Sequence, residues 1–212
     1  MADNIKENIA EETLAEDKKT RGRDRRKKTG EGKGAPKERM TREEATKEIV
    51  DWIVVIVIAI IASFVINTFI IVNATVPSSS MEKTIMAHDR IIGSRLSYLF
   101  GDPQRGDIVI FKNPDNEDVL YIKRLIGLPG ETVEIRDNMV LINGEKLFEP
   151  YLQVEIQGEF GPYKVPEGHY FMMGDNRNDS ADSRYWTNTY LSREGIVGKA
   201  QFRYWPKIKK LE

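Results

Sequence analysis

The residues of this chain best suited to chemistry are a serine cluster and a lysine that follows it. Pro77-Ser78-Ser79-Ser80-Met81 comes shortly after a long apolar run, and Lys123 lies in the segment Tyr121-Ile122-Lys123-Arg124. A serine hydroxyl attacks a carbonyl carbon when a base removes its proton, and a neutral lysine amine is one such base. The two segments together suggest a serine peptidase whose base is a lysine.

Alternation along the strand predicted around Lys123 places its amine beside apolar side chains. Tyr121 and Leu125 share the face of Lys123, whereas Arg124 points to the other face. Burial disfavours the ammonium form and lowers a lysine pKa, by up to about 3–5 units in full burial. We therefore expect Lys123 to accept the serine proton. The simpler alternative is a lysine that extends its charge into solvent from a sheet edge.

Other catalytic chemistries find little support in the composition. The chain has no cysteine, which excludes disulfides, thiolate catalysis and zinc–thiolate sites. It has two histidines, His88 and His169, and neither lies in a recognisable Ser-His-Asp motif. A metal site built on two histidines is equally unpromising.

The apolar run from Trp52 to Val72 is long enough to cross a membrane. Its 21 residues would make a helix of about 31 Å, close to the thickness of a bilayer's hydrocarbon core. Trp52 stands at one boundary, where an indole suits the interface, and Asn67 is the strongly polar exception toward the other end. A buried core helix is the alternative, but no polar stripe accompanies the run. We predict a transmembrane anchor helix at 49–73.

A cleaved signal peptide is a second alternative for this run, because Val72-Asn73-Ala74 resembles a small-residue cleavage site. Signal peptides, however, have a short basic start and an apolar core of about 7–15 residues. Here about fifty mostly polar residues precede a longer core. We therefore expect the helix to remain as an uncleaved anchor.

Basic residues ahead of the span predict its orientation. Eight of the eleven residues from Lys18 to Lys28 are Lys or Arg, and loops rich in these residues stay in the cytoplasm. We expect a single-pass protein of the cell membrane with its N-terminus in the cytoplasm. Residues 1–48 would form a charged cytoplasmic arm, and residues 74–212 an extracytoplasmic domain.

The composition of this arm predicts disorder, because it is rich in charged residues and poor in apolar ones. Contact of its basic block with anionic lipid or nucleic acid is an alternative, but a solvated tail is the simpler interpretation. The net charge of the whole chain is −1, which gives no sign of nucleic-acid binding.

The 136 residues from Pro77 to Glu212 suffice for one domain with its own core. Segments rich in Val, Ile and aromatic residues between Gly and Pro predict strands. The predicted strands are Asp107–Lys112, Val119–Ile126, Thr132–Arg136, Met139–Ile142, His169–Met173 and Ile196–Trp205. Asp137-Asn138 joins the third to the fourth, and Asn143-Gly144 marks a tight hairpin turn. The expected fold class is mainly β: an antiparallel β-sheet catalytic domain on one N-terminal transmembrane helix.

Three segments, in order, resemble the signature motifs of type I signal peptidases. They are Pro77-Ser78-Ser79-Ser80-Met81, Tyr121-Ile122-Lys123-Arg124-Leu125-Ile126-Gly127-Leu128-Pro129-Gly130 and Gly174-Asp175-Asn176-Arg177-Asn178-Asp179-Ser180-Ala181-Asp182-Ser183-Arg184. Gly106-Asp107-Ile108-Val109 fits the stretch ahead of the lysine motif. The short interval between the second and third motifs is similar to the single-anchor form typical of Gram-positive bacteria. The resemblance extends from the anchor to the carboxyl end.

The resemblance implies a membrane-anchored serine endopeptidase that removes N-terminal signal peptides from secreted preproteins at the outer face of the cytoplasmic membrane. Ser80 matches the nucleophile and Lys123 the general base. The backbone amide of Ser80 and the hydroxyl of Ser78 match the oxyanion hole, whose donors stabilise charge on the scissile carbonyl. Ser180 matches the hydroxyl that orients the lysine amine.

Two ion pairs implied by the resemblance would hold this site in shape. Asp175 would pair with Arg124 on the strand face opposite Lys123, and Asp182 would pair with Arg184. The family's preference for small residues at the first and third positions before the cut implies two shallow apolar pockets. It also implies an extended substrate paired to a strand edge.

The same resemblance implies which partners bind. They are preprotein signal peptides, the lipid bilayer and, transiently, the secretion translocon, with no nucleic acid. Neither a metal nor a cofactor is implied.

The chain departs from the family pattern at three places. Lys83 stands where proline is usual, so the turn after the nucleophile is expected to be less rigid. His88 stands where glycine usually precedes Asp89, which predicts a positive φ at a non-glycine residue. Asn178-Asp179 replaces the usual pair of any residue followed by asparagine. None of these changes removes a catalytic group.

Three other functions compete with this interpretation. Ser80-Met81-Glu82-Lys83 reads as the S-x-x-K motif of penicillin-binding proteins, but the only K-T-G, Lys28-Thr29-Gly30, precedes the serine. A self-cleaving repressor of the DNA-damage response is similar in its Ser-Lys pair, but would need a DNA-binding domain where this chain has an anchor. A non-catalytic membrane protein that merely keeps the fold is the third, and both members of the dyad are intact here.

Overall fold

The computed structural model describes residues 41–152 and 154–211, so most of the expected charged arm lies outside the described residues. The chain divides into two compact units, Met1–Val54 and Val55–Glu212, and the boundary falls inside helix α2 (Arg42–Val65). The expected division into arm, anchor and extracytoplasmic domain remains a prediction.

Helix α2 begins at Arg42, whereas the anchor was predicted to begin at residue 49. The cause is a capping box in the sequence Thr41-Arg42-Glu43-Glu44. The Glu44 amide donates to Oγ1 of Thr41 at 3.3 Å, and the Thr41 amide donates back to Oε2 of Glu44 at 2.9 Å. These reciprocal bonds satisfy amides that have no partner within the helix. The last residues assigned to the arm are therefore helical.

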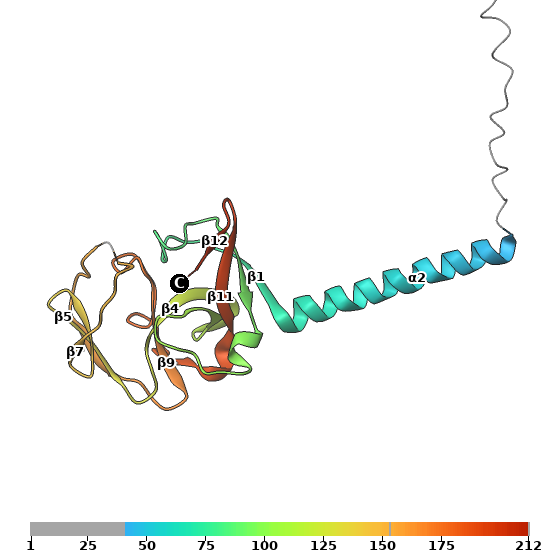
Figure 1. Cartoon of the computed structure of the whole chain (residues 1–212). Coiled ribbons are helices and arrows are strands. Elements are labelled where there is room, and N and C mark those ends of the chain that lie inside the picture. Colours follow the sequence, from blue (N-terminus) through green and yellow to red (C-terminus); the bar gives the residue numbers. More distant parts are fainter. Residues whose placement is uncertain (1–40, 153, 212) are drawn as a thin grey trace, which may run out of the picture. The chain divides into compact units, whose positions relative to one another are not determined.

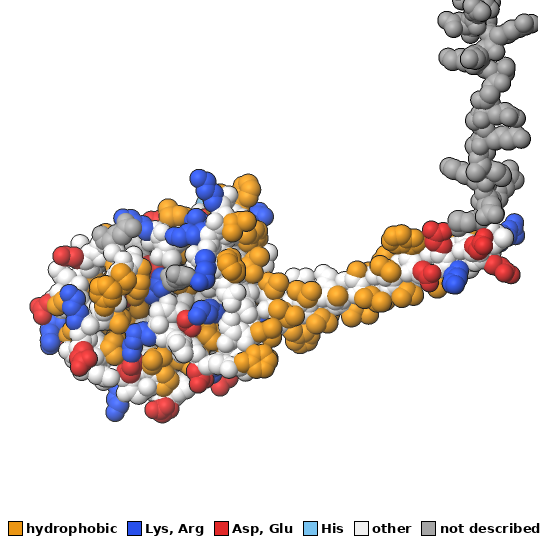
Figure 2. Space-filling view, in the orientation of Figure 1, with side chains coloured by type: hydrophobic (Ala, Val, Ile, Leu, Met, Phe, Trp, Pro, Cys, Tyr) orange, Lys and Arg blue, Asp and Glu red, His pale blue; other side chains and the backbone are white. Residues whose placement is uncertain are grey.

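The charged residues of α2 all lie between Arg42 and Asp51, and the helix carries no charge beyond them (Figure 2). None of its residues is buried by the rest of the described chain. Together with the short π-helical stretch η2 (Ile66–Ile70), it forms the helix that is long and apolar enough to cross a membrane by length and composition. The polar Asn67 donates from Nδ2 to the Ser63 carbonyl at 2.9 Å, which satisfies its amide within the helix.

The unit that follows is built from two antiparallel sheets, and the expected fold class is confirmed (Figure 1). The larger sheet has the order β1-β2-β11-β3-β4-β9-β10, with β12 paired to β11. Its strands are β1 (Ile71–Thr75), β2 (Arg90–Ser94), β3 (Ile108–Asn113), β4 (Asn116–Gly127), β9 (His169–Met173), β10 (Leu191–Ser192), β11 (Ile196–Trp205) and β12 (Lys209–Lys210). The smaller sheet has the order β7-β6-β5-β8. Its strands are β5 (Thr132–Arg136), β6 (Met139–Ile142), β7 (Glu145–Lys146) and β8 (Phe160–Lys164).

The smaller sheet is an insertion between two neighbouring strands of the larger one. Strands β4 and β9 pair antiparallel, yet β5 to β8 separate them in the sequence. The hairpins of the small sheet follow from its turn residues: Asp137, Asn138 and Asn143 have φ between 53° and 61°, and Gly144 has 86°. Such left-handed pairs match the twist of a two-residue hairpin. The chain thus returns to the larger sheet directly beside the strand that carries Lys123.

Alternation along β4 distributes its side chains among three apolar clusters. Leu125 packs with Phe111 and Trp186 in one cluster, whereas Ile122 and Ile126 enter two others. The carboxyl half of β4 is buried, while its first five residues are exposed. Strand β4 is therefore held on both faces just where its catalytic candidates lie.

Candidate active site

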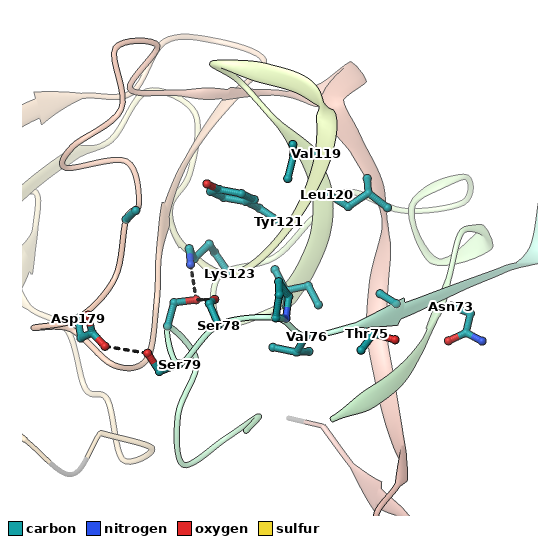
Figure 3. A pocket seen from close by; sticks show the side chains of 15 residues that line it. Asn73, Thr75, Val76, Ser78, Ser79, Val119, Leu120, Tyr121, Lys123 and Asp179 are labelled. Atoms are coloured by element: carbon teal, nitrogen blue, oxygen red, sulfur yellow. Dashed lines mark hydrogen bonds between the residues drawn. The ribbon is translucent and has the colours of Figure 1, made fainter. Parts of the chain in front are cut away.

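The serine cluster and Lys123 meet in the folded chain, as predicted. Ser80 lies in the turn that follows β1, and Lys123 lies near the middle of β4. The Lys123 amine donates from Nζ to Oγ of Ser80 at 2.5 Å (Figure 3). Both side chains are buried. The contact places a basic nitrogen directly on the hydroxyl that would attack.

Burial gives Lys123 the property expected of a base. Loss of solvation lowers the pKa of Lys123 to about 8, because the ammonium form is disfavoured away from water. Three neighbouring charges also act on this pKa: Asp182 and Asp175 raise it, and Arg184 lowers it. Tyr121 shares the strand face, with its ring centroid 5.5 Å from Nζ. The predicted apolar setting is therefore present, and the alternative of a solvent-exposed lysine is wrong.

The donors expected for an oxyanion hole lie beside Ser80. Oγ of Ser78 is 3.2 Å from Oγ of Ser80 (Figure 3). Within the described part of the chain, no acceptor is recorded for the Ser80 backbone amide. Both groups are thus placed to reach a substrate oxygen bound at Ser80.

Arg124 and Asp175 form the ion pair that was predicted on the opposite face of β4. Nε and Nη2 of Arg124 donate to the two carboxylate oxygens of Asp175 at 2.8 and 2.7 Å. Nη1 of Arg124 also donates to the Gly106 carbonyl at 2.7 Å, and the guanidinium lies 3.8 Å from the ring centroid of Tyr151. The bidentate geometry fixes the loop after β9 against β4.

The second predicted pair, Asp182 with Arg184, is also present. Nε and Nη2 of Arg184 donate to the two carboxylate oxygens of Asp182, each at 2.8 Å. The Gly174 amide donates to Asp182 at 3.0 Å, which draws the two ends of the loop together. A side chain on Gly174 would collide with Ser180 and with the Ser80 carbonyl, so this approach requires glycine.

Ser180 lies in the loop after β9 and does not make the hydrogen bond to the Lys123 amine that the resemblance implies. Its hydroxyl is buried and has no hydrogen-bond partner among the described residues. The Lys123 amine instead donates to Ser80. No hydrogen bond in this structure therefore supports the orienting role that the resemblance implies for Ser180.

Several residues that position the site were not predicted from the sequence. Oγ1 of Thr84 donates to Asp175 at 2.5 Å and so connects the nucleophile's turn to the Arg124 pair. Arg177 donates to both carboxylate oxygens of Glu149, at 2.8 and 2.5 Å. Arg177 belongs to the third motif, which could have suggested a structural role. Nothing in the sequence pointed to Glu149 or Thr84 as the partners.

Two of the family departures fall on backbone of positive φ. His88 has φ 68°, as predicted for a residue that replaces glycine. Lys83 has φ 74°, a conformation that proline cannot adopt because its ring fixes φ near −65°. Lys83 is exposed, and no contact with Ser80 is recorded among the described residues, whereas Lys123 contacts it. The S-x-x-K interpretation therefore lacks its base.

A pocket of about 510 Å³ opens over Ser80 and Lys123. Its lining comes from the segments 73–80 and 119–123 and from Asp179 and Ala181. Figure 3 shows Asn73 and Thr75 on one side of Ser78, and Asp179 on the other. Within the described residues, no group of three His, Asp or Glu side chains is placed to hold a metal ion. What the pocket can offer is a nucleophile, a base and donors for a carbonyl oxygen.

Comparison with known families gives one match that covers most of the chain. A family model described as signal peptidase, peptidase S26, matches residues 49–205. The matched residues include Ser80, Lys123 and the whole Gly174–Arg184 loop. The match therefore contains every candidate site residue named above.

Individual relatives agree with that match. The chain is 44% identical to a signal peptidase I of Leptolyngbya laminosa over 139 residues, which cover 62% of this chain and 67% of the relative. It is 42% identical to signal peptidase I T of Bacillus subtilis (strain 168) over 141 residues, 62% of this chain and 72% of the relative. Among solved structures, it is similar to the crystal structure of a signal peptidase I from Enterococcus faecalis V583. That match has 39% identity and a TM-score of 0.42, and covers 47% of this chain and 97% of the other.

Proposed function

The chain belongs to the family described as signal peptidase, peptidase S26, and from that premise we propose a serine endopeptidase that removes signal peptides with a Ser80–Lys123 dyad. The observation that carries the proposal is the hydrogen bond between the Lys123 amine and the Ser80 hydroxyl, in a setting that lowers the pKa of Lys123 to about 8. With that pKa, part of the protein molecules carry a neutral Lys123 near neutral pH, and this neutral amine can accept the serine proton.

The first half of the reaction forms an ester between Ser80 and the signal peptide. Neutral Nζ of Lys123 takes the proton from Oγ of Ser80, and Oγ bonds to the scissile carbonyl carbon. The Ser80 amide and the Ser78 hydroxyl stabilise the negative oxygen that results. When the carbon–nitrogen bond breaks, the Lys123 ammonium returns the proton to the leaving amine of the mature protein.

The second half releases the signal peptide and restores the enzyme. Nζ of Lys123, neutral again, takes a proton from a water molecule that attacks the ester carbon. The oxygen of Ser80 then leaves and recovers its proton from Lys123. One water molecule is consumed, and neither a metal nor a cofactor takes part in this scheme.

The pocket favours an extended segment with small apolar side chains. Ala74, Val76 and Ile122 contribute apolar lining close to the dyad. An extended substrate there would lie along the backbone of the segments 73–80 and 119–123. Small residues at the first and third positions before the cut would fit such a lining, which supports signal peptides as the substrates.

Membrane placement completes the proposal. Helix α2 is apolar enough to serve as the anchor, and the basic residues at 18–28 favour a cytoplasmic N-terminus. The catalytic unit would then face outward, where secreted preproteins emerge. The bilayer and, transiently, the secretion translocon would be its partners. Protease added to intact cells should reach residues after Val72 and spare the arm, and digestion of the arm would overturn this orientation.

The proposed reaction is tested with the full chain in detergent and a labelled preprotein, with mass analysis of the products. We expect a single cut at a signal-peptide boundary, which Ser80→Ala abolishes because the attacking oxygen is gone. Ser78→Ala should slow the cut by about 10²–10³-fold, since one oxyanion donor is lost and the Ser80 amide remains.

Ser97→Ala is the matched control, because Ser97 lies outside the pocket and accepts a hydrogen bond from Gln201. It should cut as fast as the unchanged protein. Cleavage that survives Ser80→Ala would eliminate Ser80 as the nucleophile. A folded chain that cuts no preprotein would favour the non-catalytic alternative.

A further inference from the structure

Asp179 brings a carboxylate into the wall of the catalytic pocket. It lines this pocket together with Ser80 and Lys123. The resemblance described above implies an asparagine at this position, where this chain has an aspartate. Among the described residues that line the pocket, Asp179 is the only one with an acidic side chain.

The carboxylate of Asp179 is held in place but is not neutralised. Its Oδ2 accepts a hydrogen bond from Oγ of Ser79 at 2.7 Å, the contact drawn in Figure 3. Its Oδ1 has no recorded partner within the described chain, and no ion pair to Asp179 is recorded there either. The side chain is exposed. One carboxylate oxygen therefore remains open to a ligand in the pocket.

The loop that carries Asp179 is fixed close to the nucleophile. Asn176 donates from its backbone amide to the Ser80 carbonyl at 3.1 Å, and from Nδ2 to the Ser79 carbonyl at 3.2 Å. The Asp179 amide donates to the Asn176 carbonyl at 3.0 Å. These bonds leave the carboxylate little freedom relative to Ser80, so a charge on a bound substrate would meet it at a defined position.

The reactive form of the site leaves this carboxylate as the sole formal charge in the pocket lining. Lys123 acts as a base only when it is neutral. The other carboxylates near the site, Asp175 and Asp182, are each paired with an arginine. A cationic substrate group would therefore be attracted to Asp179, and an anionic one repelled, with nothing else in the lining to offset the effect.

The position of Asp179 indicates which part of the substrate it meets. Part of the apolar lining comes from β1 and the residue after it, Ala74 and Val76, and would match the apolar residues of a signal peptide. Asp179 lies on the other side of Ser78 from Asn73 and Thr75 (Figure 3). A substrate that crosses Ser80 would thus leave the apolar lining and pass Asp179 with its first residues after the cut.

We propose that Asp179 is a specificity-determining residue that favours preproteins with Lys or Arg at the first or second position after the cut and disfavours Asp or Glu there. This inference rests on the proposed function, since it assigns a preference to that same site. An exposed ion pair changes an equilibrium by about two- to fivefold. Lysine should therefore raise kcat/KM by about that factor relative to glutamine, and glutamate should lower it similarly.

The test compares peptides that differ at one position. The full chain in detergent is given signal-peptide substrates with Lys, Gln or Glu at the first or second position after the cut. We expect the Lys:Glu ratio of kcat/KM to be about four or more at one of these positions for the unchanged protein. Asp179→Asn keeps the size of the side chain and removes its charge, so the ratio should fall toward one. Raising the salt concentration should reduce the ratio of the unchanged protein in the same way.

Glu145→Gln is the matched control. It removes one negative charge from β7 of the smaller sheet, outside the pocket, and should leave the Lys:Glu ratio unchanged. A ratio that is the same in the unchanged protein and in Asp179→Asn would overturn the proposal. So would a charge preference that appears only when the substitution is placed before the cut.

A binding measurement separates this inference from the proposed reaction. Ser80→Ala cannot cut, so fluorescence anisotropy with labelled Lys and Glu peptides reports their dissociation constants directly. Tighter binding of the Lys peptide, lost in Ser80→Ala with Asp179→Asn, would support the role of Asp179 even if the unchanged protein cut nothing. Equal binding of both peptides to Ser80→Ala, together with equal cleavage, would reject it.

Discussion

The neighbouring basic side chains of Lys123 and Arg124 on β4 lie in two different environments. Lys123 and Arg124 are both buried, with 4% and 2% of their surface exposed. Arg124 has a bidentate carboxylate partner in Asp175 on its face of the strand. Lys123 has no ion-pair partner among the described residues, and its amine contacts a serine hydroxyl instead.

The difference fits a structural role for Arg124 and the proposed role of Lys123 as a base. A buried charge that is paired and hydrogen-bonded can remain charged, and it fixes the elements that carry the pair. Loss of solvation on burial disfavours the ammonium form and lowers the pKa of Lys123 to about 8. The alternation of a β-strand separates the two functions by a single residue.

The largest effect should follow from changes to Lys123 itself. Lys123→Met keeps the apolar stem but has no basic nitrogen, and Lys123→Arg has a guanidinium with a pKa above about 12. Both should lower kcat by at least about 10²–10⁴-fold, the usual contribution of a general base. Kinetics on a labelled preprotein, with circular dichroism to check the fold, measures this.

Lys123→Arg is the more informative of the two variants. If Lys123 served only as a structural cation, as Arg124 does, arginine would restore much of the activity. An active Lys123→Arg enzyme would contradict the base assignment and remove the contrast between the two residues.

Most long strands of the unit that contains Lys123 and Arg124 could be predicted from the sequence. The strands β5, β6, β9 and β11 begin and end at the predicted residues, because turn residues and β-branched runs mark them locally. Strand β1 was missed: Ile71–Thr75 was assigned in part to the apolar anchor span. Composition alone does not show where an apolar helix gives way to a strand, because Ile and Val suit both settings.

The site residues could be predicted from the sequence where they belong to one of the three motifs. The family resemblance implied the pairing of Asp175 with Arg124, and alternation along the strand predicted apolar neighbours for Lys123. The bond from Thr84 to Asp175 joins residues 91 apart in the sequence, and only the tertiary fold brings them together. The start of α2 is different, since the capping box at Thr41-Arg42-Glu43-Glu44 is a local signal that the sequence itself contains.

A second, smaller effect should follow from removing the partner of Arg124. Asp175→Ala leaves a buried guanidinium without its carboxylate, which should lower the free energy of unfolding by about 3–5 kcal/mol. Thermal or denaturant unfolding of the full chain in detergent, followed by circular dichroism, measures this loss.

The double variant Arg124→Met with Asp175→Leu serves as the control. It removes both charges, so part of the lost stability should return. If Asp175→Ala unfolds as readily as the unchanged protein, the pair does not hold the loop to β4, and the structural half of the contrast is wrong.

The smallest effect should be a shift in the pH dependence of cleavage. Because Lys123 must be neutral to act, kcat/KM should rise about tenfold per pH unit below pH 8 and level off above it. Asp182 raises the pKa of Lys123, since a nearby negative charge favours the ammonium form, and Arg184 lowers it. Asp182→Asn removes the negative charge that raises the pKa of Lys123 and keeps the Arg184 charge that lowers it. The pKa should therefore fall, and the pH profile of kcat/KM should move to lower pH. Initial rates across pH 5–10 would show the direction, with Glu145→Gln as a control for general loss of negative charge. A profile that stays in place, or moves to higher pH, would mean that the activity follows a group other than Lys123.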